Sequence, residues 1–257
     1  MSKFLIIPVL NEIESSLALA KEYGFGFEFN DFFLPDVLED GKRTDEIVGK
    51  YKSYKLPETL TLHGDFFDVL VFSDDSRIRE ISELRIRQSI EAAIKTGAGA
   101  VIFHTNHNPF FTAETYVKNW QKRNYDFWSR ILSEYPQMNI YMENMCDFTP
   151  AMLAELAESL KGYPNFGVCF DYAHASVFGS DIDGWVKTIA PYVKHMHIND
   201  NDLKNDLHLA VGDGMIDWQL FKKYYERYFS DITVLIETSS IDKQRRSAEY
   251  LKRLGIL

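Results

Sequence analysis

Cysteine is scarce in this sequence, and long hydrophobic runs are missing. Only two cysteines occur among 257 residues, Cys146 and Cys169, which excludes a disulfide framework and fits a reducing compartment. No stretch approaches the length of a membrane span, and the apolar run in Met1–Leu10 is too short for the hydrophobic region of a signal peptide. We therefore expect a cytoplasmic protein without membrane attachment.

Basic residues are in the minority, since 28 Lys and Arg face 38 Asp and Glu and give a formal net charge of −10. This charge disfavours nucleic acid and anionic membranes as partners. The sequence also lacks a Pro/Gly/Ser-rich linker, a low-complexity tract, a short repeat and any glycine-rich nucleotide loop. With 46% hydrophobic residues, the chain is expected to form one domain over residues 1–257.

Short β-branched or aromatic runs alternate with segments of helical periodicity, a pattern typical of parallel strands joined by crossover helices. Strand-then-helix units of roughly 30 residues favour an α/β fold of the closed (β/α)8 TIM barrel type over an open doubly wound sheet. The predicted strands are Phe4–Val9, Phe25–Phe29, Thr59–His63, Ala100–His104, Asn139–Glu143, Gly167–Asp171, Val193–Ile198 and Ile232–Glu237.

Two segments have the clearest helical signals. One is Ile78–Lys95, and the other is Ala151–Leu160, which follows Thr149 as the predicted N-cap and Pro150 at the first helical position. The apolar residues that mark the first helix are Ile78, Ile81, Leu84, Ile90, Ala93 and Ile94.

The third to eighth predicted strands each end on a side chain that could bind a metal. These residues are His63, His104, Glu143, Asp171, His197 and Glu237. The carboxyl ends of barrel strands form the active-site face, where clustered carboxylates need a compensating cation. Any one of the six, taken alone, could instead be an ordinary polar residue at a strand end. Together, Glu143, Asp171, His197 and Glu237 offer three oxygens and one nitrogen, a set compatible with Zn, Mn, Co or Mg.

Other polar residues lie just beyond the strands. His174 would face the same way as Asp171 on a helical turn, and Asp206 and His208 would share a face if extended, although an exposed polar loop is the ordinary alternative for this pair. His195 is expected beneath the ligands, and His107 in an exposed loop.

Five segments, in this order and at these strand ends, resemble the xylose isomerase-like barrel superfamily. They are Ile140–Asn144, Cys169–His174, His195–Asp200, Asp206–His208 followed by Gly212–Gly214, and Ile236–Thr238. This superfamily joins sugar isomerases and epimerases of the tagatose 3-epimerase and inosose-processing types to the endonuclease IV family of DNA repair enzymes.

The resemblance has two implications for the site. The epimerases imply that Glu143, Asp171, His197 and Glu237 hold one divalent metal and that the two glutamates move protons. Endonuclease IV implies that the same four, together with His63, His104, His174, Asp206 and His208, hold three zinc ions. All nine positions carry compatible residues here, whereas the epimerases commonly have an arginine near the position of His208. The metal count therefore stays open between one and three.

Two functions follow from these implications. The first is isomerisation or epimerisation of a small sugar, sugar phosphate or cyclitol in carbohydrate metabolism, by proton transfer through an enediolate. The second is hydrolysis of abasic DNA by a multi-zinc phosphodiesterase. A nuclease needs phosphate contacts, yet residues 64–76 contain four Asp and no Lys or Arg. The basic candidates are Lys42, Arg43, Lys204, Lys243, Arg245 and Arg246. We expect the first function, the sugar isomerase or epimerase. Assembly of the chain into a homo-oligomer is compatible with the sequence.

Overall fold

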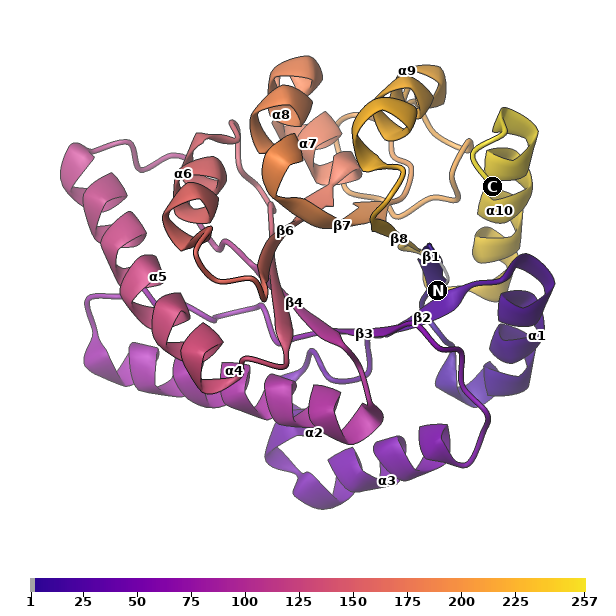
Figure 1. Ribbon diagram of the computed structural model, residues 1–257, viewed down its shortest axis with the longest axis horizontal. Helices are drawn as coiled ribbons and strands as arrows, with labels where there is room; N and C mark the ends of the chain where they lie inside the picture. Colours follow the sequence, from indigo (N-terminus) through magenta and orange to yellow (C-terminus); the bar gives the residue numbers. More distant parts are fainter. Residues whose placement is uncertain (1–2) are drawn as a thin grey trace.

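The computed structural model describes residues 3–257, so the first two residues of the predicted domain lie outside the described part. Eight parallel strands close into a barrel in sequence order, and β1 pairs with both β2 and β8 (Figure 1). The predicted closed barrel is thereby confirmed and the open sheet excluded. The strands are β1 (Phe4–Ile6), β2 (Gly26–Phe29), β3 (Leu60–His63), β4 (Ala100–His104), β5 (Asn139–Glu143), β6 (Phe166–Asp171), β7 (Val193–Ile198) and β8 (Thr233–Ile236).

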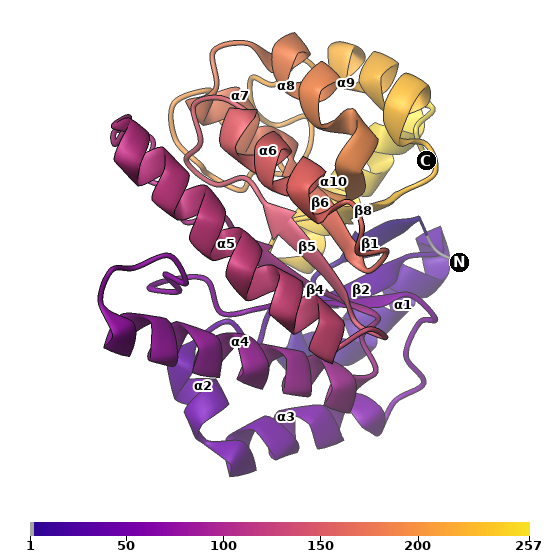
Figure 2. The same cartoon turned by 60° about the vertical axis from the view of Figure 1, so that its left-hand side comes forward.

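Helices surround the barrel on its outer side (Figure 1). They are α1 (Ile13–Tyr23), α2 (Pro35–Glu39), α3 (Gly41–Lys52), α4 (Ser76–Thr96), α5 (Glu114–Glu134), α6 (Ala151–Leu160), α7 (Tyr172–Phe178), α8 (Ile182–Ile189), α9 (Trp218–Tyr224) and α10 (Ile241–Leu254). Short 3-10 turns cover Leu10–Glu12 and Ala190–Tyr192, and a π-helical turn covers Tyr225–Phe229. Both α2 and α3 pack against α4 (Figure 2). None of these helices, within residues 3–257, combines the length and apolarity needed to span a bilayer.

The first and last strands end earlier than the sequence predicts. β1 stops at Ile6 instead of Val9, because Pro8 has no N–H to donate to a neighbouring strand and the Val9 N–H donates to Ser16 Oγ at 2.9 Å. β8 stops at Ile236, although the Glu237 N–H still donates to the Ile198 carbonyl at 2.9 Å. Glu237 therefore keeps its place at the carboxyl end of the barrel.

Alternation along the strands separates two environments. Outward residues such as Phe27, Phe103 and Phe170 are fully buried in the hydrophobic core between the barrel and the helices. Inward residues form a layer inside the barrel, where the Tyr141 and His195 rings stack with their centroids 6.1 Å apart. This layer, in which Glu28, Thr61 and His195 are the buried polar residues, lies directly beneath the strand-end residues.

The predicted helix over Ile78–Lys95 is confirmed as α4, and the one correction among the two helices concerns the cap of α6. On α4, Ile90 and Ala93 are buried, but Ile78, Ile81, Leu84 and Ile94 are 40 to 52% exposed. The buried stripe of α4 instead includes small polar residues such as Ser89, whose hydroxyl accepts from the Asp65 N–H at 3.0 Å. The bounds of α6 are as predicted, but Pro150 itself is the N-cap and no side chain caps this helix, so Thr149 is not the cap.

Candidate metal centre at the carboxyl end of the barrel

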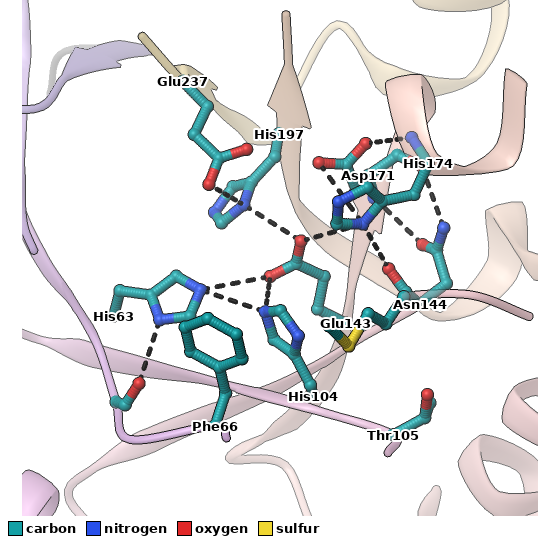
Figure 3. Close-up of polar contacts among 12 residues, drawn as sticks. His63, Phe66, His104, Thr105, Glu143, Asn144, Asp171, His174, His197 and Glu237 are labelled. Atoms are coloured by element: carbon teal, nitrogen blue, oxygen red, sulfur yellow. Dashed lines mark hydrogen bonds and ion pairs between the residues drawn. The ribbon is translucent and has the colours of Figure 1, made fainter. Parts of the chain in front are cut away.

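The nine predicted ligand residues converge at the carboxyl end of the barrel. They form groups whose nitrogen and oxygen atoms all lie within 4.8 Å of one another. Three of these groups are His63, His104 and Glu143; Glu143, Asp171 and His197; and His174, Asp206 and His208. Glu237 forms a further group with His63 and His197. Figure 3 shows the Glu143 carboxylate between the side chains of the first two groups.

The first group brings two imidazoles to one carboxylate oxygen. His104 Nε2 lies 3.2 Å and His63 Nε2 lies 3.6 Å from Glu143 Oε2, and the two imidazole nitrogens are 3.1 Å apart. The other nitrogen of His63 lies 2.9 Å from the Gly64 carbonyl. The Phe66 ring stacks on His104 with a centroid distance of 4.4 Å and covers the group (Figure 3).

The second group uses the other oxygen of the same carboxylate. His197 Nδ1 lies 3.3 Å from Glu143 Oε1 and 3.7 Å from Glu237 Oε1. Register places Asp171 opposite His197, because β6 and β7 pair at these two residues. Glu143, Asp171 and His197 are all fully buried.

The third group lies nearer to solvent. Asp206 Oδ2 lies 3.3 Å from His174 Nε2 and 2.9 Å from His208 Nε2. His174 Nδ1 lies 2.8 Å from the Asn144 carbonyl, and the Asn144 side chain exchanges hydrogen bonds with the backbone of Asp171. Asn144 was not singled out from the sequence as a site residue, yet it connects the ligands of two groups.

The loop that carries Asp206 and His208 is held from below by Asp200. The Asp200 carboxylate accepts hydrogen bonds from the Gly212 and Ile216 N–H groups and from Trp218 Nε1. A Cβ on Gly214 would lie 2.4 Å from Asp200 Oδ1, so glycine is required there. Gly212, with a φ of 92°, and Gly214 together permit the close approach that fixes the loop.

The chemistry of the site fits a divalent cation. Both Glu143 oxygens, Asp171 Oδ2 and His197 Nδ1 are buried and have no hydrogen-bond partner among residues 3–257. Buried polar atoms normally have a partner, and several carboxylate oxygens without one are costly. Oxygen ligands with one or more imidazoles suit Zn, Mn, Co or Mg.

Protons provide the charge balance in the metal-free protein. Burial raises the pKa of Asp171 and His174 lowers it. The negative charges of Glu237 and Glu143 raise it further, and the result is a pKa of about 7. Burial lowers the pKa of His208, but Glu237 and Asp206 raise it to about 10. Burial would raise the pKa of Glu143, yet the neighbouring His197 and His104 hold it well below its usual range. A cation that binds here must therefore displace protons.

Glu28 on β2 is a buried charge that the sequence analysis missed. Its Oε2 accepts a hydrogen bond from Thr61 Oγ1 at 2.6 Å and lies 3.1 Å from His195 Nε2, while Oε1 lies 3.0 Å from His197 Nε2. Burial would raise the pKa of Glu28, but His197 and His195 bring it below its usual range. The available signal was a single charge between Phe27 and Phe29 in a barrel strand, both faces of which are buried.

The prediction that His107 lies in an exposed loop is wrong. Its side chain is only 10% exposed, and Nδ1 lies 3.3 Å from Asp147 Oδ1. The Asp147 carboxylate also accepts from Thr105 Oγ1 at 2.8 Å and from the Met145 N–H at 3.0 Å. His107 and Asp147 thus connect two loops, and neither residue belongs to the groups of metal-binding candidates.

Comparison with known proteins places the chain in a family. Residues 17–254 match the family described as xylose isomerase-like TIM barrel, and the chain belongs to this family. The uncharacterized protein MJ1311 of Methanocaldococcus jannaschii is 28% identical over 204 residues, which are 75% of this chain and 69% of that protein.

Solved structures share the whole fold. The TTHB071 protein from Thermus thermophilus, soaked with ZnCl2, is 22% identical with a TM-score of 0.78 over 98% of each chain. A D-tagatose 3-epimerase-like protein is 25% identical with a TM-score of 0.77 over 99% of this chain and 97% of that one. Sugar 3-epimerases are also among the structures with this fold.

We expect the metal-free protein to become less stable as the pH rises from about 6.5 to about 9. The pKa of His208 is raised from 6.5 to about 10, so its proton-linked stabilisation is complete below pH 6.5 and is lost as the pH approaches 10. The pKa of Asp171 is raised from 3.8 to about 7, so its proton-linked stabilisation is also lost as the pH rises, but over this lower range. Urea unfolding in the presence of a chelator measures this dependence.

The control for this prediction is a second histidine outside the cluster. His208→Gln should flatten the upper part of the pH dependence, whereas His107→Gln should retain it. A metal-free wild-type protein whose stability increases over this pH range would contradict the charge balance described above.

Proposed function

We propose that this protein is a divalent-metal-dependent isomerase or epimerase of a small sugar or cyclitol. The observation that carries the proposal is the placement of Glu143 and Glu237, which approach the same His197 nitrogen at 3.3 Å and 3.7 Å from β5 and from the end of β8. Two carboxylates that flank one position can remove a proton from a substrate carbon and return one. The family membership and the similarity to a D-tagatose 3-epimerase-like protein support this assignment.

In this proposal, Glu143, Asp171, His197 and Glu237 hold one cation, which can be Zn, Mn, Co or Mg. When bound, it would polarise carbonyl and hydroxyl oxygens and so acidify the neighbouring carbon-bound proton. Glu143 or Glu237 takes that proton to give an enediolate, and the opposite glutamate returns a proton to carbon. His174, with its imidazole 3.6 Å from Glu143 Oε1, can contact substrate or relay a proton.

The substrate is proposed to be unphosphorylated because four of the six basic candidates, Arg43, Lys243, Arg245 and Arg246, already have partners. Arg43 pairs with Asp36, Arg245 with Glu22, and Arg246 with both Asp213 and Asp242. Lys243 Nζ donates to the His208 carbonyl at 2.9 Å. A phosphate group would have to displace these partners.

We expect Glu143→Gln and Glu237→Gln each to reduce turnover by a factor of about 10² to 10⁴, because each removes a proton-transfer group. The measurement is deuterium incorporation from D2O at carbon, with D-tagatose, D-fructose and L-ribulose as probes. Circular dichroism checks the fold, and Glu58→Gln, an exposed glutamate before β3, is the matched control. If both site variants keep wild-type exchange rates, the assignment of the two glutamates is wrong.

A second candidate function is phosphodiester hydrolysis at abasic DNA by a multi-metal centre. The observation in its favour is that all three groups are formed and that the first two share Glu143. Several metals held within a few ångströms of one another suit the attacking and leaving oxygens of such a reaction. The net charge of −10 and the engaged arginines weigh against DNA binding.

We expect purified protein at high concentration, supplied with Zn²⁺, to leave a duplex with one abasic site uncut, because the net charge is −10 and the candidate arginines are paired with carboxylates. Gel analysis of a labelled duplex measures this. Cleavage that EDTA abolishes and that His208→Gln reduces would instead favour the multi-metal hydrolase.

A further inference from the structure

Glu28 and the His197 ring face each other beneath the metal centre. Glu28 Oε1 lies 3.0 Å from His197 Nε2, and both side chains are fully buried. Within residues 3–257, neither atom makes a well-aligned hydrogen bond to any other group. Each atom is therefore available to the other.

The opposite side of the same ring faces the metal-binding candidates. His197 Nδ1 lies 3.3 Å from Glu143 Oε1, whereas Nε2 points to Glu28 (Figure 3 shows the Nδ1 side). A neutral imidazole has one N–H and one lone pair, and a cation requires the lone pair. If Nδ1 binds the cation, the proton must be on Nε2, where Glu28 is the acceptor.

The layer inside the barrel holds Glu28 in this position. Thr61 Oγ1 donates to Oε2 at 2.6 Å, and His195 Nε2 lies 3.1 Å from the same oxygen. His195 is in turn fixed by Thr233, whose Oγ1 lies 2.6 Å from Nδ1. With Oε2 committed to Thr61 and His195, Oε1 is left for His197.

We propose that Glu28 is a positioning residue that keeps the His197 proton on Nε2 and so presents Nδ1 to a divalent cation. The inference rests on the proposed function, since it takes His197 as a metal ligand. Partners of this kind orient the ligand and increase its basicity. Glu28 itself contacts neither the cation nor the substrate.

Replacement of Glu28 by Gln tests the proposal through metal affinity. We expect Glu28→Gln to weaken Zn²⁺ binding about ten- to hundredfold, measured by competition with a chromophoric chelator. Asp147→Asn is the matched control, because it neutralises another buried carboxylate that contacts Thr105 and Met145 and none of the metal-binding candidates. Its Zn²⁺ affinity should stay at the wild-type value.

A double-mutant cycle separates positioning from a general structural effect. In a His197→Gln background, Glu28→Gln should have little further effect on Zn²⁺ affinity, because Glu28 acts through His197. An equal loss in both backgrounds would overturn the proposal. If Glu28→Gln does not fold, Glu28→Asp replaces it in the cycle, since it keeps the charge but shortens the reach to His197.

The outcomes distinguish this inference from the proposed function. A wild-type protein that binds no divalent cation would overturn both. A wild-type protein that binds Zn²⁺, together with a folded Glu28 variant of unchanged affinity, would overturn only the role of Glu28.

Discussion

Compensation of clustered charge at the carboxyl end of the barrel is the constraint on which the rest of this structure depends. Glu143, Asp171 and His197 are fully buried within a few ångströms of one another. Like charges in such a place destabilise the fold unless protons or a cation neutralise them. Because burial and neighbouring charges raise the pKa values of Asp171 and His208, protons can serve this purpose in the metal-free protein. A divalent cation is the natural replacement, and the proposed chemistry follows from it.

The barrel makes this arrangement possible because parallel strands all end on the same face. Glu143, the last residue of β5, lies in the centre of the site, where one oxygen faces His63 and His104 and the other faces His197. Asp200 and the glycine turn then bring Asp206 and His208 to the rim. The number of bound cations depends on how many of these groups of side chains bind one. One cation fits the sugar isomerase or epimerase, and three fit the phosphodiester hydrolase.

The strand-end residues could be predicted from the sequence because a run of β-branched or aromatic residues indicates each strand, and a His, Asp or Glu stands at its end. His63, His104 and Asp171 needed nothing further, since the closed barrel brings all such ends together. Asp206 and His208 were less certain, because the approach of the two side chains depends on loop geometry, including a φ of 46° at His208.

Other features depended on tertiary packing that no local pattern encodes. Glu28 acquires its role from residues on β3 and β7 that are distant in sequence. His107 is covered because Asp147 from another loop and the rings of Tyr116 and Trp120 on α5 pack against it. On α4, the helix itself could be predicted, but its buried face depends on packing, because small residues such as Ser89 are buried while Ile81 is exposed.

The central claim is that Glu143, Asp171, His197 and Glu237 hold one divalent cation. The most direct measurement is the metal content of dialysed protein by mass spectrometry, with the site located by anomalous scattering from crystals. We predict about one tightly held ion per chain, beside Glu143 and His197. Protein with no bound ion, or with ions in all three groups, would contradict the claim.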